Sequence, residues 1–316
     1  MQPTSAAAGP VPFKDIAAVA VARRPVAEEY GDVVAALPSR LYPPQQRWRE
    51  YQGAWFREAW VPGIVALQRR FEPRAGDVLL ASLPKCGTTW LKALAFATAA
   101  RGVYPPAAAG GDGRHPLLRL NPHECVPFLE GIYLDGEEAK LDAAPTPRLM
   151  STHASLRPHH YLMISGSPSP CHYLMCGSSS VRVHTWEAQS GSISLGIGTR
   201  AKPDKVLFLK YEEVLHDPTK NIEKIAEFIG QPFSDAEKEA GIVESIIELC
   251  SFEKMKASGA NSTGSLHMMA NEYPHESFFR KGVIGDWVNH VTPEMADSLD
   301  KFLSAKFYGS GFTFAE

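Results

Sequence analysis

The residues with the clearest chemistry lie in the run Pro-Lys-Cys-Gly-Thr-Thr at positions 84–89. Lys85 supplies a full positive charge, Gly87 lets the backbone approach an oxyanion closely, and the two threonines, Thr88 and Thr89, supply hydroxyl donors. The lysine precedes the glycine, whereas the Walker A lysine follows the last glycine of its motif. The run therefore predicts a phosphate-binding loop that is not the common ATP or GTP signature. A strand-to-helix corner with a solvated lysine is the structural alternative.

A strand before this loop and a helix after it must position these groups. An apolar run of strand length covers residues 78–83, and residues 90–100 are mostly strong helix formers with apolar side chains three and four positions apart. A helix that begins just after a strand points its first free N–H groups at the end of the sheet, where they form an anion site. We expect Lys92 to lie on the surface of this helix, outside the site.

The stretch Pro-Lys-x-Gly-Thr-Thr-Trp-Leu-Lys at 84–92 resembles the 5′-phosphosulfate loop of the cytosolic sulfotransferases. These enzymes move a sulfuryl group from 3′-phosphoadenosine 5′-phosphosulfate (PAPS) to a hydroxyl or an amine. The resemblance implies a PAPS-dependent sulfotransferase acting on a small hydroxylated acceptor. Cys86 stands where many members have serine, and the neighbouring backbone amides make this change tolerable. Residues 121–135 are similar to a stretch of the plant members, which would bring His123, Phe128 and Tyr133 near the acceptor. A surface helix with an apolar face is the alternative.

A base is needed near the acceptor, because its oxygen loses a proton as the new S–O bond forms. The run PRLMSTH at 147–153 is strand-like and ends in a histidine, whose unperturbed pKa suits this role. In the family, a Thr-His pair after the phosphate loop supplies the base. The resemblance therefore makes His153 the candidate base and Lys85 the second candidate catalytic residue, although a histidine considered alone is usually structural or solvated.

Later stretches resemble the nucleotide-binding elements of the family. Tyr211 would approach the adenine, unless it only packs on the core, and the Ser-Phe-x-x-Met element at 251–255 would bracket it. The run SFFRKG at 277–282 would grip the 3′-phosphate, with a solvated basic turn as the alternative. The resemblance assigns these residues to the nucleotide: Lys85, Cys86, Gly87, Thr88, Thr89, Trp90, Tyr211, Ser251, Phe252, Met255, Phe278, Arg280, Lys281 and Gly282.

Residues 154–201 do not fit this pattern. They contain ten serines and five glycines, Glu187 is their only acidic residue, and they show neither helical nor strand periodicity. The family has an arginine and a serine here that hold the 3′-phosphate, and neither is found. The segment is a divergent loop, an out-of-frame translation or a wrong splice model, and we favour the last two jointly. An inactive relative that lacks part of the 3′-phosphate site is therefore an alternative function.

The whole chain of 316 residues, 44% hydrophobic, can bury a sizeable core. Strand-to-helix units near 78–100 and 206–229 predict a single α/β domain with a central parallel sheet flanked by helices. We expect residues 1–26 to be a disordered or low-complexity N-terminus and 27–316 to form the domain. The resemblance covers about 45–153 and 202–308.

Charge and cysteine content restrict the partners and the compartment. A net charge of −3 gives no general attraction to nucleic acid or to anionic membranes. Five cysteines without a CxxC pair, no apolar run of eighteen residues and no signal peptide predict a cytoplasmic protein. We expect no metal, since the His and Cys spacings fit no standard zinc pattern. Part of the family's dimerisation pattern is present at 288–294, which gives weak support for a homodimer. A kinase-like nucleotide-binding protein is a further alternative, which the position of Lys85 disfavours.

Overall fold

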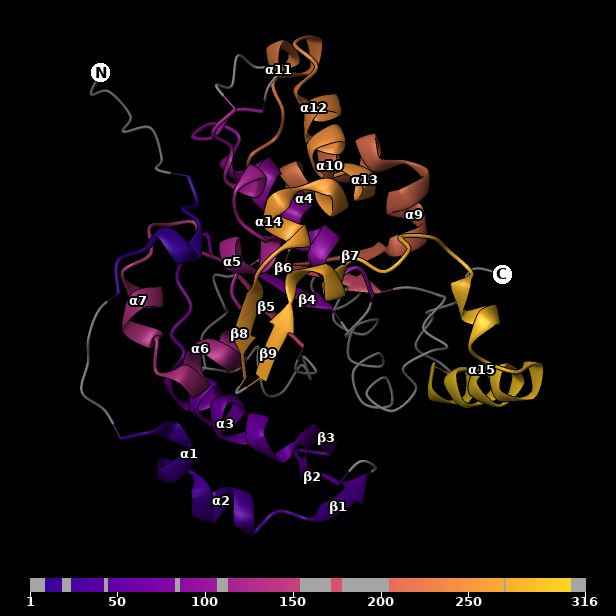
Figure 1. The fold of residues 1–316 in the computed structure, drawn as a ribbon. Helices are drawn as coiled ribbons and strands as arrows, with labels where there is room; N and C mark the ends of the chain where they lie inside the picture. The colour runs from indigo at the N-terminus through magenta and orange to yellow at the C-terminus, as the bar shows by residue number, and fades with distance from the viewer. Residues whose placement is uncertain are drawn as a thin grey trace.

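The computed structural model describes residues 9–18, 24–42, 45–82, 86–106, 113–153, 172–177, 205–269 and 271–307. Its centre is a parallel sheet with the strand order β5-β4-β6-β7. The strands are β4 (Val78–Ser82), β5 (Leu149–Thr152), β6 (His172–Gly177) and β7 (Val206–Lys210) (Figure 1). The predicted strand-to-helix units thus contribute β4 and β7, which are not neighbours but lie on either side of β6.

Helices cover both faces of this sheet. Leu80 packs toward α4 (Thr88–Ala100), α10 (Pro218–Phe228) and α12 (Ile242–Leu249). Its neighbour Leu79 packs on the opposite face, toward α1 (Val26–Glu29), α3 (Val61–Arg70) and α6 (Leu129–Asp135). In Figure 1 the first group lies above the sheet, and α1 and α3 lie below it. Successive strand residues therefore pack into two hydrophobic cores, one on each face of the sheet. The predicted α/β domain with a central parallel sheet is confirmed.

Strand β6 lies inside the segment in which we expected no regular element. It pairs with β4 from Val78↔His172 to Ser82↔Cys176, and with β7 along its other edge. A central parallel strand is buried on both faces and shows no polar alternation, and a short apolar run such as Tyr-Leu-Met-Cys carries too few residues to reveal a period. The absence of a period was therefore a poor guide here. The other residues of 154–201 lie outside the described part of the chain.

The second helix of the sequence pattern forms as predicted. The Asp217 side chain accepts a hydrogen bond from the Lys220 N–H, and Pro218 is the first residue of α10. This is a helix N-cap, in which a carboxylate oxygen satisfies an otherwise unpaired backbone donor. Ile222 and Ile225 are fully buried against the sheet. Capping and spacing together thus fixed both the start and the buried face of α10.

Smaller elements surround these layers. A three-stranded antiparallel sheet consists of β1 (Ser39–Tyr42), β2 (Gln46–Tyr51) and β3 (Ala54–Arg57), and a hairpin of β8 (Ser265–Met268) and β9 (Asn271–Pro274). The remaining α-helices are α2 (Gly31–Ala35), α5 (Pro122–Cys125), α7 (Glu138–Asp142), α9 (Tyr211–His216), α11 (Asp235–Glu239), α13 (Phe252–Ala257), α14 (Gly259–Ser262) and α15 (Pro293–Phe307). The 3₁₀ turns are η1 (Phe13–Asp15), η2 (Glu58–Trp60), η4 (Pro116–Leu118), η5 (His275–Phe278) and η6 (Asp286–Asn289).

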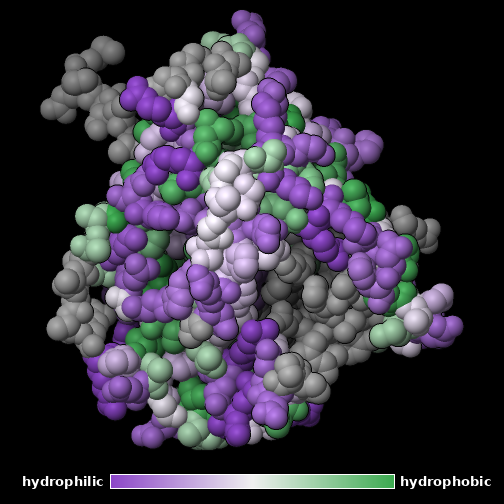
Figure 2. All heavy atoms as spheres, in the orientation of Figure 1, coloured by the Kyte–Doolittle hydropathy of each residue, from purple (hydrophilic) through white to green (hydrophobic). Residues whose placement is uncertain are grey.

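The surface seen in Figure 2 is largely hydrophilic, and hydrophobic side chains appear there in small separate groups. Within the described ranges, none of the helices has the length and apolar character needed to cross a bilayer.

Part of the N-terminal stretch that we expected to be disordered packs on the domain. Phe13 is 8% exposed, and the Lys140 ammonium lies 4.3 Å from the centre of its ring. Its neighbours Lys14 and Asp15 form ion pairs with Glu124 and Arg119. A composition rich in alanine therefore hid one aromatic anchor, and the residues around Phe13 belong with the folded domain.

A buried histidine makes the stability of this fold dependent on pH. His115 is 5% exposed, and its Nδ1 accepts a hydrogen bond from the Leu117 N–H at the start of η4. Burial lowers its pKa to about 4, so the unfolded chain takes up a proton here at a higher pH than the folded chain does. The contribution of the neutral His115 to the free energy of unfolding is therefore fully present above pH 6.5. It is lost as the pH falls through about 4, and the loss amounts to up to about 3 kcal/mol.

Urea unfolding between pH 7.5 and pH 4 measures this loss. An asparagine at position 115 keeps an acceptor for the Leu117 N–H but does not titrate, so His115→Asn is expected to flatten the slope between pH 6.5 and pH 4. A variant with the same slope as the wild type would show that other groups cause the dependence.

Candidate active site

The candidate site lies where β4 and β5 end. These strands are parallel neighbours in the register Ala81↔Thr152, so their carboxyl ends meet at the same edge of the sheet. Helix α4 begins at Thr88, shortly after β4, and His153 directly follows β5. The topology therefore brings the predicted base to the predicted phosphate loop. Lys85 lies outside the described residues.

Gly87 has the conformation that the start of α4 requires. Its φ is +87°, in the left-handed region that favours glycine, and it is the N-cap residue of the helix. The ring of Tyr211 lies against it, and a Cβ added at Gly87 would stand 2.7 Å from the Tyr211 Cδ2. Trp90 meets the same ring edge-on, with 5.6 Å between the ring centres. Gly87, Trp90 and Tyr211 therefore form one cluster, from which a side chain at position 87 is excluded.

The two threonines of the loop have different environments. Thr88 is buried, and its hydroxyl lies 2.7 Å from the hydroxyl of Ser82, the last residue of β4. Thr89 is half-buried, and its Oγ1 lies 3.0 Å from the Nε2 of His123. The side chain of Cys86 is buried. Thr88 thus ties the helix to the strand, and Thr89 is the more accessible of the two hydroxyls.

The imidazole of His153 is fixed through one ring nitrogen. Its Nδ1 lies 2.7 Å from the carbonyl oxygen of Ser82. A carbonyl only accepts hydrogen bonds, so Nδ1 carries the proton and the lone pair of the neutral ring is on Nε2. The ring of Phe128 packs beside it, with 4.4 Å between the ring centres. This arrangement gives His153 the tautomer that a base acting through Nε2 requires.

Glu130 supports the same histidine from α6. Its side chain is almost fully buried and accepts hydrogen bonds from the Thr152 hydroxyl and from the His153 backbone N–H. The carboxylate therefore holds the end of β5 and the base in place. Glu130 is a residue that the sequence did not reveal. The available signal was a single acidic residue among the apolar residues of 129–132.

Lys92 is not on the surface, and our expectation for it was wrong. It is 0% exposed, donates a hydrogen bond to the Val126 carbonyl at 2.8 Å, and has its Nζ 3.0 Å from the Nδ1 of His123. The Nζ also lies 3.5 Å from the centre of the Phe128 ring. Burial lowers the pKa of the ammonium well below its usual value, and the Glu130 carboxylate opposes this. The apolar pattern predicted one buried face, but α4 is buried on nearly every side.

The predicted 3′-phosphate loop turns around a buried carboxylate. Arg280 and Lys281 lie 3.4 Å and 2.6 Å from Asp286, whose side chain is 3% exposed. The ion pair with Lys281 holds the pKa of Asp286 well below its usual range. Gly282 has φ +67°, and a Cβ there would stand 2.5 Å from the Phe252 ring. The structure therefore brings the two cations together on a tight turn packed on Phe252.

The three other predicted nucleotide residues have contacts within the protein. The Ser251 hydroxyl caps α13 by accepting from the Lys254 N–H, and Met255 is 5% exposed in the core. Phe278 packs against His123, with 4.2 Å between the ring centres. Phe278 therefore joins the basic turn to His123 of α5, which in turn contacts Thr89 at the start of α4. The nucleotide roles of Ser251 and Met255 stay predictions.

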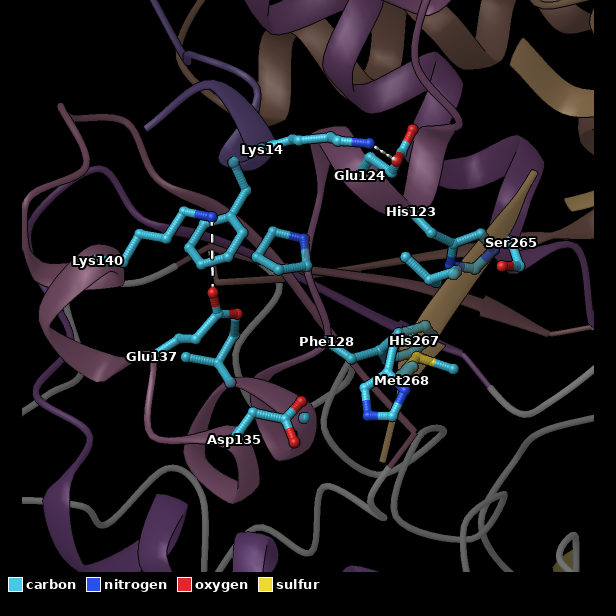
Figure 3. A pocket seen from close by; sticks show the side chains of 15 residues that line it. Lys14, His123, Glu124, Phe128, Asp135, Glu137, Lys140, Ser265, His267 and Met268 are labelled. Atoms are coloured by element: carbon cyan, nitrogen blue, oxygen red, sulfur yellow. Dashed lines mark hydrogen bonds and ion pairs between the residues drawn. The ribbon is translucent and has the colours of Figure 1, made fainter. Parts of the chain in front are cut away.

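A cavity of about 280 Å³ adjoins this site. His123 and Phe128 form part of its wall, and Figure 3 shows Lys14 directed toward Glu124 and Lys140 toward Glu137 on the other side. Met268 and the rest of β8 close it further. Rings, a thioether and paired charges thus line a space that shares Phe128 with the surroundings of His153. Among the described residues, no group of three or more His, Cys, Asp or Glu side chains is arranged to hold a metal ion.

Comparisons with known proteins agree with this geometry. The sulfotransferase domain model matches residues 75–175 and 170–311. Cytosolic sulfotransferase 8 of Arabidopsis thaliana is 35% identical, over 90% of this chain and 92% of that protein. Cytosolic sulfotransferase 6 of the same plant is 34% identical, over 92% and 96%.

Solved structures of similar fold include an Arabidopsis thaliana putative steroid sulphotransferase, 26% identical, with a TM-score of 0.69 over 94% of this chain and 99% of that one. The mouse sulfotransferase SULT7A1, complexed with PAP (adenosine 3′,5′-bisphosphate), is 21% identical. Its TM-score is 0.57 over 84% of this chain and 95% of that one. The kinase-like alternative has no support in these matches. The chain therefore belongs to the plant cytosolic sulfotransferase family, whose enzymes transfer a sulfuryl group.

Proposed function

We propose that this chain transfers the sulfuryl group of PAPS to a hydroxyl of a small acceptor, with His153 as the base. The observation that carries the assignment of roles is the double contact of Ser82. Its carbonyl accepts from the His153 Nδ1, and its hydroxyl pairs with Thr88 at the start of α4. One residue thus holds the base in its working tautomer and in a fixed relation to the anion site.

The phosphosulfate binds at the start of α4. The free N–H groups of the first turn point toward it, Lys85 adds a full charge, and Thr89 adds a hydroxyl donor. PAPS supplies the activated sulfuryl group, and this chain's own residues orient it and neutralise its charge. Because Lys85 and the helix N-terminus provide this neutralisation, the proposal includes no metal ion. Arg280 and Lys281 bind the 3′-phosphate, which then competes with Asp286 for them.

The adenine is bound by aromatic side chains on the far side of the loop. Trp90 and Tyr211 form one aromatic pair beside Gly87, and Phe252 packs on the basic turn. Flat rings bind a base by stacking with little loss of side-chain freedom. This placement lets the nucleotide span from α4 to the basic turn, which are joined by Phe278 and His123.

The acceptor is a small hydroxylated molecule with an apolar body. One of the similar structures is that of a putative steroid sulphotransferase, and a steroid is a molecule of this kind. The cavity beside Phe128, with its rings and paired charges, suits an amphipathic acceptor. We place the protein in the cytoplasm, as the names of its relatives suggest, and a homodimer stays a prediction.

Calorimetric titration with adenosine 3′,5′-bisphosphate (PAP), with ATP as the control, tests the proposal. We expect PAP to bind and ATP to bind at least about 10-fold more weakly, because ATP lacks the 3′-phosphate that Arg280 and Lys281 would pair with. A folded protein that binds neither nucleotide would contradict the proposal and support an inactive relative.

Replacing Lys85 by alanine is expected to weaken PAP binding about 10- to 150-fold, because it removes a charged hydrogen-bond partner of the 5′-phosphate. Turnover is expected to fall as well, since in the proposed mechanism the same charge stabilises the transferring group. Lys220→Ala, on the exposed side of α10, is the matched control and should change neither quantity. Equal affinities of the Lys85 variant and the wild type would remove Lys85 from the site.

A further inference from the structure

A continuous row of polar contacts connects a buried lysine to the phosphate loop. Lys92 is 0% exposed, and its Nζ lies 3.0 Å from the Nδ1 of His123. The Nε2 of the same imidazole lies 3.0 Å from the hydroxyl of Thr89, which is one helical turn before Lys92 on α4. Only the last group of this row, Thr89, is half-exposed at the start of the helix. The row thus leads from the interior to the predicted anion.

The chemistry of these groups gives the row a direction. In its ammonium form Lys92 has three donors and no acceptor, so in that form it donates to the Val126 carbonyl and to the His123 Nδ1. The Nε2 of a neutral His123 then carries the proton and donates to Thr89. The Thr89 oxygen then accepts the hydrogen bond from Nε2, so the hydrogen of the Thr89 hydroxyl points away from His123 and can be donated to another acceptor. An anion bound at the start of α4 is an acceptor of that kind, and it favours the ammonium form of Lys92.

The imidazole is held so that this direction persists. The ring of Phe128 stacks on the imidazole of His123, with 5.5 Å between the ring centres. The ring of Phe278 packs on the same imidazole, with 4.2 Å between the ring centres. His123 is 5% exposed, and its backbone N–H donates to the Asn121 side chain. A ring packed in this way loses little further freedom when a ligand binds.

We propose that Lys92 and His123 are positioning residues that keep the Thr89 hydroxyl as a donor to the 5′-phosphosulfate. This inference rests on the proposed function, because it needs an anion at the start of α4. It also gives a reason for the buried lysine. Burying an ammonium costs free energy, and if only packing mattered, an apolar side chain of similar length could replace it.

A double-mutant cycle on the full-length protein tests the inference, with PAP affinity measured by calorimetry. Thr89→Val removes the hydroxyl and is expected to weaken PAP binding about 10- to 100-fold. Lys92→Met keeps the length of the side chain but removes the donors, and we expect it to weaken binding about 3- to 30-fold. The double variant is expected to bind no more weakly than Thr89→Val, since the lysine acts only through that hydroxyl.

If the losses of PAP affinity in the two single variants multiplied in the double variant, the proposal would be overturned. A Lys92→Met variant that unfolds at the wild-type temperature and binds PAP normally would also overturn it. If Lys92→Met does not fold, the pair His123→Gln and His123→Phe decides instead. Glutamine keeps an N–H that can reach Thr89, whereas phenylalanine has none, so only His123→Gln should keep most of the affinity. Equal affinities of these two variants would contradict the inference. A wild-type protein that does not bind PAP would contradict the proposed function itself, before any variant is compared.

Discussion

Replacing His153 by alanine is expected to lower kcat by a factor of about 10²–10⁴, because the acceptor hydroxyl then loses its base. The affinity for PAP should stay within about 3-fold of the wild type, since the imidazole faces the acceptor and not the nucleotide. The tautomer of His153 is the physical basis of this expectation. The Ser82 carbonyl holds the proton on Nδ1, so the lone pair that takes up the acceptor proton is on Nε2.

A steady-state assay with a phenolic acceptor and calorimetry with PAP measure the two effects separately. His216→Ala is the matched control, because His216 is exposed at the end of α9 and lies outside the proposed site. A His153→Ala variant with the turnover of the wild type would show that another group, or water, takes the proton. A variant that loses PAP affinity to the same extent as turnover would indicate that His153 supports the nucleotide site instead.

The site could be predicted to the extent that it follows from local sequence and strand order. Gly87, Thr88 and Thr89 lie where a strand, a loop and a helix start predict them, and His153 follows the neighbouring strand. Parallel strands place their carboxyl ends at one edge of the sheet, so the order of the motifs was sufficient to bring these residues together. The capped start of α10 was predictable for the same reason, since capping is local.

The residues that the sequence did not reveal act through contacts between distant segments. Lys92 meets His123 and Val126, which are more than thirty positions away. Glu130 meets Thr152 and His153 at the end of β5, 22 and 23 positions away. A lysine on a helix usually has its charged end in water, so the pattern favoured a surface position. Only the packing of α5 against α4 shows that this lysine is enclosed.

The stretch 121–135 shows where the structure decides between alternatives that the sequence left open. His123, Phe128 and Tyr133 are all buried. For Tyr133 this agrees with the alternative of a helix whose apolar face packs on the core, and the acceptor roles of His123 and Phe128 stay predictions. Tyr133 packs with Phe71 in the core on the side of α3, whereas His123 and Phe128 face the phosphate loop and the base. His123 lies on α5, Phe128 is the N-cap residue of α6, and Tyr133 lies within α6. Helices of four and seven residues are too short for their periodicity to show which neighbours such side chains will meet.

The fold depends on a buried ion pair at the opposite edge of the sheet from the site, and this pair provides the second large expected effect. Asp77 and Arg148 precede β4 and β5, and their side chains are 0% and 1% exposed. The Arg148 Nε and Nη2 donate to the two carboxylate oxygens at 2.9 Å and 2.6 Å. Arg148→Met leaves the Asp77 carboxylate buried without this partner, and we expect it to lower the free energy of unfolding by about 3–5 kcal/mol.

The double variant Asp77→Asn, Arg148→Met separates two effects: the cost of a buried carboxylate without its arginine, and the loss of the arginine's packing. Asparagine keeps an acceptor for the Arg74 N–H, which donates to Asp77 at 2.7 Å, but it carries no charge. Urea unfolding at pH 7.5 should therefore find the double variant clearly more stable than Arg148→Met alone. If the two variants were equally unstable, the packing of the arginine, and not its charge, would be what β4 and β5 require. Because the pair lies at the amino ends of the strands, the folded fraction of each variant should bind PAP with wild-type affinity, so that the strength of the sheet and the chemistry of the site can be altered separately.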